Sequence, residues 1–221
     1  MSSPLRIPSD LPEIDESMLA EDLAQLAEIG KQREYRKNTM LINEGDEGDT
    51  LYVILSGRVK VFAVDASDRE VTYGMYGPGN YFGEMSLDGG PRSASVITVE
   101  PTVCATVSKR ALREFIANRP AFAFHLLITV IHRARQATRI ARSLALESVY
   151  SRLKRFLEDN TVAQPNGTHL LAQRLTHQEL ASRIGASREM VSRILKDLET
   201  GGYLMVQDHR LIVVQKLPDQ W

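Results

Sequence analysis

The chain has 221 residues, of which 43% are hydrophobic and 25% charged, a composition typical of a soluble globular protein. Its longest nearly apolar run, residues 122–131, is far shorter than the roughly 20 residues that a membrane-spanning helix needs. Residues 1–16 lack the charged-then-apolar order of a signal peptide, and the single cysteine, Cys104, supplies too few thiolates for a disulfide or an iron–sulfur cluster. We therefore expect a cytoplasmic protein without membrane contacts.

Charge is unevenly distributed behind an overall value of −1. Residues 1–107 carry 9 basic and 18 acidic side chains, residues 108–146 carry 8 and 1, and the remainder carries 10 and 9. Segments with such different balances suggest different partners. Because the positive excess lies in the middle segment, charge alone does not locate a nucleic-acid-binding face.

The N-terminal half predicts one helix, from Met18 to about Ile29 with Ser17 as its cap, followed by short strands. Nine of the 14 glycines lie between Gly45 and Gly90. Short strands separated by glycine turns, without helices between them, indicate a sandwich, a barrel or a jelly roll. The predicted strands are residues 50–55, 58–64, 70–76, 94–98 and 103–107.

Between two of these strands, a glycine and an arginine are suited to binding an anion. Gly83 lets backbone amides approach an anion closely, and a short helix beginning there would direct its N–H groups toward it. Arg92 offers a guanidinium fork to a phosphate, and Glu84 can accept a ribose hydroxyl. We expect Arg92 to face a ligand charge and not a core partner. The alternative is a turn beside a Glu84–Arg92 salt bridge.

The next segment predicts a short helix capped by Ser108 and then a long helix that starts at Pro120 and extends to about Leu146. Apolar residues on the long helix follow spacings of three and four, a heptad seam whose alanines permit close approach of a second helix. We favour a dimer contact; the alternative is packing on the core of its own domain. The seam comprises Leu127, Val130, Ala134, Ala137, Ala141 and Leu144, and the opposite face, interpreted as solvated, carries Arg133, Arg135, Arg139 and Arg142.

The last third of the chain predicts three helices and a hairpin. Thr176 with Glu179 three residues later makes a capping box, and Gly185 suits a tight turn between two short helices. The predicted elements are helices over residues 147–159, 176–184 and 187–198, a polar loop over residues 160–168, and hairpin strands over residues 203–206 and 211–214.

The second helix of this pair presents polar side chains suited to reading base edges. Arg188 and Glu189 lie in its first turn, and Arg193 extends the same face. Arginine donates bidentately to guanine, glutamate accepts from cytosine, and the N-terminal part of such a helix meets the bases. The alternative is an exposed ion pair between Glu189 and Arg193. The candidate DNA-binding residues are Thr176, Gln178, Ser187, Arg188, Glu189, Ser192, Arg193 and Lys196.

Two parts of the sequence resemble the cyclic-AMP receptor protein and Fnr (Crp/Fnr) family. Residues 175–181 (LTHQELA) and 185–193 (GASREMVSR) resemble its winged helix-turn-helix, and residues 81–86 (YFGEMS) and 91–96 (PRSASV) resemble its phosphate-binding cassette. The resemblance covers nearly the whole chain.

This resemblance implies an α+β protein of three parts. An N-terminal β jelly roll that binds a cyclic nucleotide is expected over residues 1–118, a long dimerisation helix over residues 119–146, and a C-terminal winged helix-turn-helix over residues 147–221. It also implies that residues matching Arg188, Glu189 and Arg193 read a TGTGA-like half-site.

The resemblance further implies a ligand set. Gly83 and Glu84 would bind the sugar and nearby backbone, while Arg92 and Ser93 would hold the cyclic phosphate. The family's receptor for cyclic AMP has two adjacent hydroxyl residues on the long helix that meet the adenine, one from each subunit. The matching positions here are Ala137 and Thr138, so that only Thr138 keeps a hydroxyl.

We therefore expect a homodimeric transcription regulator that binds double-stranded DNA, works with RNA polymerase and is controlled by cyclic AMP. Alternatives are control by cyclic di-GMP, because some relatives with a similar cassette respond to it, or action without a ligand. Another class of protein, a nucleotide-sensing module of a larger effector, lacks support because no effector sequence is present. The five histidines show no metal-ligand spacing, and we expect no enzyme activity, metal or haem.

Overall fold

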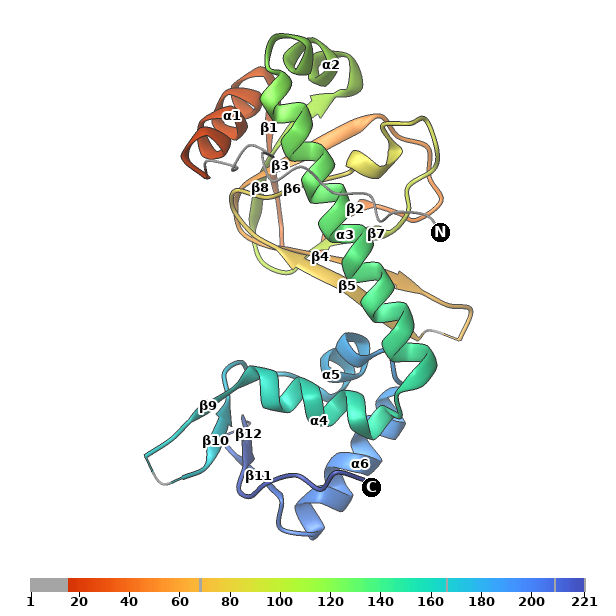
Figure 1. The fold of residues 1–221 in the computed structure, drawn as a ribbon, viewed down its shortest axis with the longest axis vertical. Coiled ribbons are helices and arrows are strands. Elements are labelled where there is room, and N and C mark those ends of the chain that lie inside the picture. The colour runs from red at the N-terminus through yellow and green to blue at the C-terminus, as the bar shows by residue number, and fades with distance from the viewer. Residues whose placement is uncertain (1–15, 68, 166, 209, 221) are drawn as a thin grey trace, which may run out of the picture.

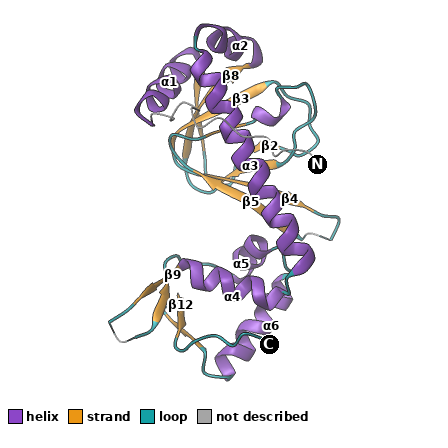
Figure 2. Ribbon diagram, viewed as in Figure 1, coloured by secondary structure: helices purple, strands orange, loops and turns teal. Residues whose placement is uncertain are grey.

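A computed structural model describes residues 16–67, 69–165, 167–208 and 210–220, which form two parts joined by one long helix (Figure 1). Strands dominate the N-terminal part and helices the C-terminal part (Figure 2). The predicted α+β class and the order of β roll, long helix and helical domain are confirmed. Residues 1–15, on which the expectation of no signal peptide rests, and Trp221 lie outside the described residues.

Two four-stranded sheets form the roll, with strand orders β1-β8-β3-β6 and β2-β7-β4-β5. All pairings in these sheets are antiparallel, as in a jelly roll. The five predicted strands are present, and the structure adds β1, β2 and β6. The strands are β1 (Lys31–Tyr35), β2 (Met40–Ile42), β3 (Thr50–Ser56), β4 (Val59–Val64), β5 (Glu70–Tyr76), β6 (Tyr81–Phe82), β7 (Ser95–Thr98) and β8 (Thr102–Ser108).

Strand β3 is apolar on both faces because it separates two hydrophobic clusters. Leu51 and Val53 pack toward the helices, in a cluster that includes Leu26, while Ile54 packs toward the second sheet with Phe82. All are almost fully buried, and burying a side chain of this size stabilises the fold by about 1.5–3 kcal/mol. These clusters fix the position of β6, and therefore of the glycine segment that follows it.

Three helices pack against the roll. Helix α1 (Glu16–Ile29) begins two residues before the predicted start, so Ser17 lies inside its first turn and the prediction of Ser17 as the cap is wrong. Helix α2 (Lys109–Asn118) is capped as predicted, because the Ser108 hydroxyl accepts a hydrogen bond from the Ala111 amide at 3.3 Å. Helix α3 (Pro120–Leu146) has the predicted bounds.

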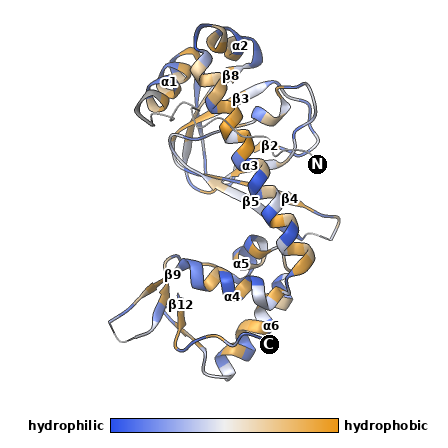
Figure 3. Cartoon of the chain, viewed as in Figure 1, coloured by the Kyte–Doolittle hydropathy of each residue, from blue (hydrophilic) through white to orange (hydrophobic). Residues whose placement is uncertain are grey.

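The predicted seam of α3 is largely exposed in the single chain. Leu127 is 52% exposed, and Ala134, Ala137 and Ala141 are also exposed. The apolar turns of α3 beside the roll, and the hydrophilic patches nearer its C-terminal end, are visible in Figure 3. The alternative that the whole seam packs on the core of its own domain is therefore wrong, because burial in the chain stops short of these residues.

The C-terminal domain packs three helices against a four-stranded antiparallel sheet of order β11-β12-β10-β9. Its core is one apolar cluster in which Leu153, Leu180 and Leu198 are fully buried. Strand β9 lies within the predicted polar loop of residues 160–168, and β10 follows it in a segment for which the sequence predicted no element. The elements are α4 (Val149–Asn160), β9 (Thr161–Ala163), β10 (His169–Leu171), α5 (His177–Ile184), α6 (Arg188–Thr200), β11 (Leu204–Gln207) and β12 (Arg210–Val213).

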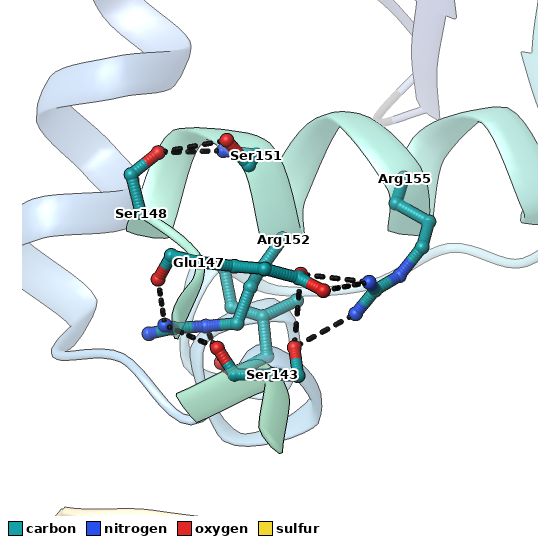
Figure 4. Close-up of polar contacts among 7 residues, drawn as sticks. Ser143, Glu147, Ser148, Ser151, Arg152 and Arg155 are labelled. Carbon is teal, nitrogen blue, oxygen red and sulfur yellow. Dashed lines mark hydrogen bonds and ion pairs between the residues drawn. The ribbon is translucent and has the colours of Figure 1, made fainter. Parts of the chain in front are cut away.

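The two parts meet at β5 and at the start of α4. The hydroxyls of Thr72 on β5 and Ser182 on α5 are 2.8 Å apart. At the other contact the buried Arg152 donates to the carbonyls of Glu147 and Ile184, each at 2.7 Å, and so ties the end of α3 to the end of α5 (Figure 4 shows the α3 side). Within the described residues no single helix is long and apolar enough to span a membrane; α2 and α3 pass that test only as a pair bent by 119°.

Candidate nucleotide cavity and DNA-binding face

The glycine segment after β6 has the local structure that the sequence predicted. Gly83 adopts a left-handed conformation with φ of 91°, and a short 3₁₀ helix over residues 84–86 follows it directly. A Cβ atom at this position would lie 2.7 Å from the Thr50 carbonyl oxygen, so both the backbone angle and the space require glycine. The turn thus presents backbone at the wall of the neighbouring cavity.

Arg92 lies in the same cavity but is already hydrogen-bonded. Its guanidinium donates to the Gly83 carbonyl and the Ser86 hydroxyl, both at 2.9 Å, and to the Thr50 carbonyl at 3.0 Å. The residue is only 7% exposed. The expectation that Arg92 has no core partner is therefore wrong: this side chain also fixes the turn. Because three bonds use only part of its five N–H donors, it can still contact an anion.

Glu84 is paired with an arginine that the sequence analysis assigned to the solvated face of α3. Its buried carboxylate forms an ion pair with Arg133, whose guanidinium also donates to the Tyr81 carbonyl at 2.5 Å and lies 4.7 Å from the Tyr76 ring centre. Burial alone would lower the pKa of Arg133, but the facing Glu84 carboxylate raises it above its ordinary value, so Arg133 stays protonated. The predicted alternative, a Glu84–Arg92 salt bridge, is wrong.

Arg133 could not be singled out from the sequence. Four arginines lie along α3, at positions 133, 135, 139 and 142. The heptad pattern alone does not show which of their side chains points toward the roll. Val130, which lies about one turn before Arg133 on α3, lines the same cavity.

These residues surround a cavity of about 300 Å³ between the roll and α3. Ser93 lines it, as does Ala137 on α3. Thr138 does not line it in the single chain, where its hydroxyl donates to the Ala134 carbonyl at 3.0 Å. A role for Thr138 therefore requires a second subunit, as the sequence analysis assumed, and remains a prediction.

Both short helices of the C-terminal domain are capped: the predicted Thr176–Glu179 box begins α5, while Ser187, predicted only as a DNA-binding residue, caps α6. Thr176 accepts from the Glu179 amide at 3.2 Å, and the Glu179 carboxylate accepts from the Thr176 amide at 2.7 Å. Gly185 ends α5 with φ of 63°, and the Ser187 hydroxyl caps α6 by accepting from the Met190 amide at 3.2 Å. These caps fix the angle between α5 and α6.

Most of the predicted DNA-binding side chains are exposed. No ion pair joins Glu189 to Arg193 among the described residues, so that alternative is not supported. His177, which was not among the predicted DNA-binding residues, is exposed, and its Nδ1 atom lies 2.7 Å from the hydroxyl of Ser192, which was. Thr176, Gln178, Arg188, Glu189, Arg193 and Lys196 are exposed, and Ser187 and Ser192 are half-buried.

The described part of the chain bears on two further kinds of site, a metal centre and a reactive thiol. No cluster of three or more His, Cys, Asp or Glu side chains there could hold a metal ion. Cys104 is buried between the sheets, and burial raises the pKa of its thiol to about 12. It is therefore a protonated core residue.

Comparison with known proteins decides the family. Residues 32–119 match the cyclic nucleotide-binding domain, and residues 138–218 match the Crp-like helix-turn-helix domain. The CRP-like cAMP-activated global transcriptional regulator of Mycobacterium tuberculosis is 32% identical over 174 residues, which cover 77% of this chain and 78% of that protein. This chain belongs to the Crp/Fnr family of transcription regulators.

Other members of the Crp/Fnr family are similarly close. The CRP-like protein Clp of Xanthomonas campestris pv. campestris is 31% identical over 194 residues, covering 82% of this chain and 83% of Clp. A solved structure of the c-di-GMP responsive global regulator CLP of Xanthomonas campestris superposes with a TM-score of 0.78 at 28% identity, covering 89% of this chain and 99% of that one. The chain is thus a Crp/Fnr regulator with a DNA-binding helix-turn-helix and a cyclic nucleotide-binding domain.

Proposed function

We propose that this regulator works as a homodimer that reads a palindrome of TGTGA-like half-sites under the control of cyclic AMP bound in the roll cavity. One observation carries the proposal: Val130, Ala134 and Ala137 line the cavity and also belong to the predicted seam of α3, on which Ala134 and Ala137 are exposed. Ligand binding in the cavity would therefore alter the packing of the same residues that form the dimer contact. We take residues 1–118 as the effector domain, 119–146 as the dimerisation helix and 147–221 as the DNA-binding domain.

The cavity fits the ligand class by size and by chemistry. Its volume of about 300 Å³ is at the lower end of the range for small-molecule sites. Backbone amides near Gly83, with Arg92 and Ser93, would hold the cyclic phosphate, and Glu84 would accept from the ribose. Because Arg133 pairs with Glu84, α3 responds directly to any change at that carboxylate. Thr138 of one subunit would contact the base bound by its partner.

Control then follows from differential affinity. The ligand shifts the population only if it binds the DNA-competent arrangement of α3 better than the other arrangement. Arg133 and Gln136 connect α3 to the roll, since Gln136 donates to the Tyr73 carbonyl at 2.6 Å. Rotation of α3 would move the end of that helix, which Arg152 ties to α5.

DNA recognition is proposed to depend on α6. Two recognition helices related by a two-fold axis fit two half-sites about one helical turn apart. Arg188 would donate to guanine and Glu189 would accept from cytosine, so that Arg188→Ala or Glu189→Ala costs about 1–3 kcal/mol per half-site. Gel-shift titration of a palindromic duplex tests this role, and equal affinity of wild type and both variants would refute it. RNA polymerase is the expected partner at a bound promoter.

Cyclic di-GMP is the second candidate ligand, because the similar CLP structure is of a c-di-GMP responsive regulator while the M. tuberculosis relative is cAMP-activated. Isothermal titration calorimetry with cyclic AMP, cyclic GMP and cyclic di-GMP separates the two. If cyclic AMP binds, Ala137→Thr restores a second hydroxyl and tightens binding by up to about 1.5 kcal/mol. If the ligand is cyclic di-GMP, the same change leaves the affinity unchanged or weakens it. Absence of binding by all three at millimolar concentration would contradict nucleotide control.

A further inference from the structure

A second cavity, of about 680 Å³, lies between α3, α4, β5 and the end of α5; it adjoins the nucleotide cavity, with which it shares Gln136 and Ile140 of α3. Five arginines line it, against two acidic residues, Glu147 and Asp159. Such an excess of positive charge in a recess is unfavourable unless something neutralises it. The hydrogen-bond and ion-pair partners of each arginine show which of these charges are already compensated.

Two of the five arginines have protein partners. Arg152 is buried, and its guanidinium donates to backbone carbonyls at the ends of α3 and α5. Arg155 forms two short contacts with the Glu147 carboxylate, at 2.6 and 2.7 Å (Figure 4). This pair consumes one of the two acidic groups of the cleft.

Three arginines remain without a carboxylate. Arg139 and Arg142 are exposed on α3 and have neither a hydrogen bond nor an ion pair among the described residues. Arg183 is half-buried, and no described carboxylate lies within salt-bridge distance of it. Among the described residues, its guanidinium donates a hydrogen bond to the Gln173 side-chain carbonyl alone, at 3.3 Å, and lies 5.8 Å from the Phe156 ring centre. Burial lowers the pKa of Arg183 and outweighs the opposite effect of the Glu179 carboxylate, which is not in contact with it.

We propose that this interdomain cleft, defined by Arg139, Arg142 and Arg183, is a binding site for an anion that carries two or more phosphate groups. The guanidinium fork matches phosphate oxygens, and three uncompensated cations match a ligand with more than one negative charge. The volume lies within the range of small-molecule sites. Because Arg139 and Arg142 come from the long helix and Arg183 from the DNA-binding domain, a bound anion holds these two elements together. The proposal does not depend on which nucleotide enters the roll.

Calorimetric titration of the full chain with inorganic pyrophosphate tests the site, using the double variant Arg139→Gln/Arg142→Gln. Both side chains are exposed and unpartnered, so the fold is expected to be unchanged, which circular dichroism checks. The matched control is Arg113→Gln/Arg135→Gln, which removes the same charge from exposed positions outside the cleft. We expect saturable binding by wild type and control, and at least tenfold weaker binding by the cleft variant. Arg183→Gln is expected to weaken it likewise.

Three results would overturn the proposal. One is the absence of saturable heat when wild type is titrated with pyrophosphate up to about 1 mM, a concentration that, as a Kd, corresponds to only weak binding. Another is an equal loss in the cleft and control variants, which would indicate attraction by overall charge. The third is a loss of DNA affinity in the cleft variant without any pyrophosphate binding by wild type, which would assign the arginines to the DNA backbone. Under the proposal, the cleft variant keeps wild-type DNA affinity when no pyrophosphate is present.

Discussion

Replacing Arg152 with methionine is expected to destabilise the C-terminal domain strongly. The residue is 8% exposed, and its three shortest hydrogen bonds all go to carbonyl oxygens, at 2.7 Å to Ile184, 2.7 Å to Glu147 and 3.2 Å to Gly185. Each hydrogen bond from a charged donor contributes about 1.5–3 kcal/mol, and the losses overlap because one side chain makes all three. Since methionine fills a similar volume without donors, we expect a cost of about 3–5 kcal/mol.

Arg155→Met is the matched control, one turn further along α4. Arg155 contacts Glu147 and Ser143, but its side chain is 52% exposed, so its removal should cost less than about 1 kcal/mol. Urea unfolding followed by circular dichroism gives the midpoint for each variant. If the slope m of free energy against urea concentration is the same, the difference in midpoints gives the difference in the free energy of unfolding. A cost for Arg152→Met within about 1 kcal/mol of the control would refute the view that this guanidinium joins α3 to α5.

Three further predictions concern the seam, the glycine turn and pH. Ala141→Glu, on the exposed seam but outside both cavities, should give monomers in sedimentation at micromolar concentration; a wild type that is itself monomeric would contradict the seam. Gly83→Ala should abolish nucleotide binding, since its Cβ would lie 2.7 Å from the Thr50 carbonyl oxygen. The control Gly45→Ala has a φ of 84° but open space around its Cβ, so it should only destabilise the fold by about 1 kcal/mol. Equal effects of the two variants on nucleotide binding would show that the backbone angle alone matters. Burial lowers the pKa of His125 and outweighs the opposite effect of a nearby aspartate, so the unfolded chain binds the proton more readily. Stability should therefore fall as the pH drops below about 6.5, and His125→Gln should reduce that fall. Urea midpoints that change equally for both proteins between pH 7.5 and 5.5 would count against this prediction.

Much of the fold is predictable because local chemistry and packing agree. Ser108, Pro120 and the Thr176–Glu179 box place helix starts where the structure has them. The strands that the sequence does not predict lack a local pattern: β1 is KQREY, mostly exposed, and is held by pairing with β8. Strand β6 has only two residues, too few to show alternation. Long-range pairing decides such segments.

The site shows the same division. The glycine turn at Gly83 and the Thr176–Glu179 box follow from local geometry, so the sequence predicts them. The roles of Arg92 and Arg133 depend on which distant carbonyl or carboxylate lies opposite, namely those of Thr50 and Glu84. No spacing rule within one helix reveals these partners, and the arginines of α3 therefore looked alike.

The most direct test of nucleotide-controlled DNA binding is fluorescence anisotropy of a labelled duplex with two TGTGA-like half-sites, titrated with the full chain with and without nucleotide. We predict that saturating cyclic AMP changes the Kd by about 5- to 150-fold, the usual span of allosteric coupling, and that a duplex with scrambled half-sites shows no such change. An unchanged Kd with cyclic AMP, cyclic GMP and cyclic di-GMP alike would contradict control through the roll cavity.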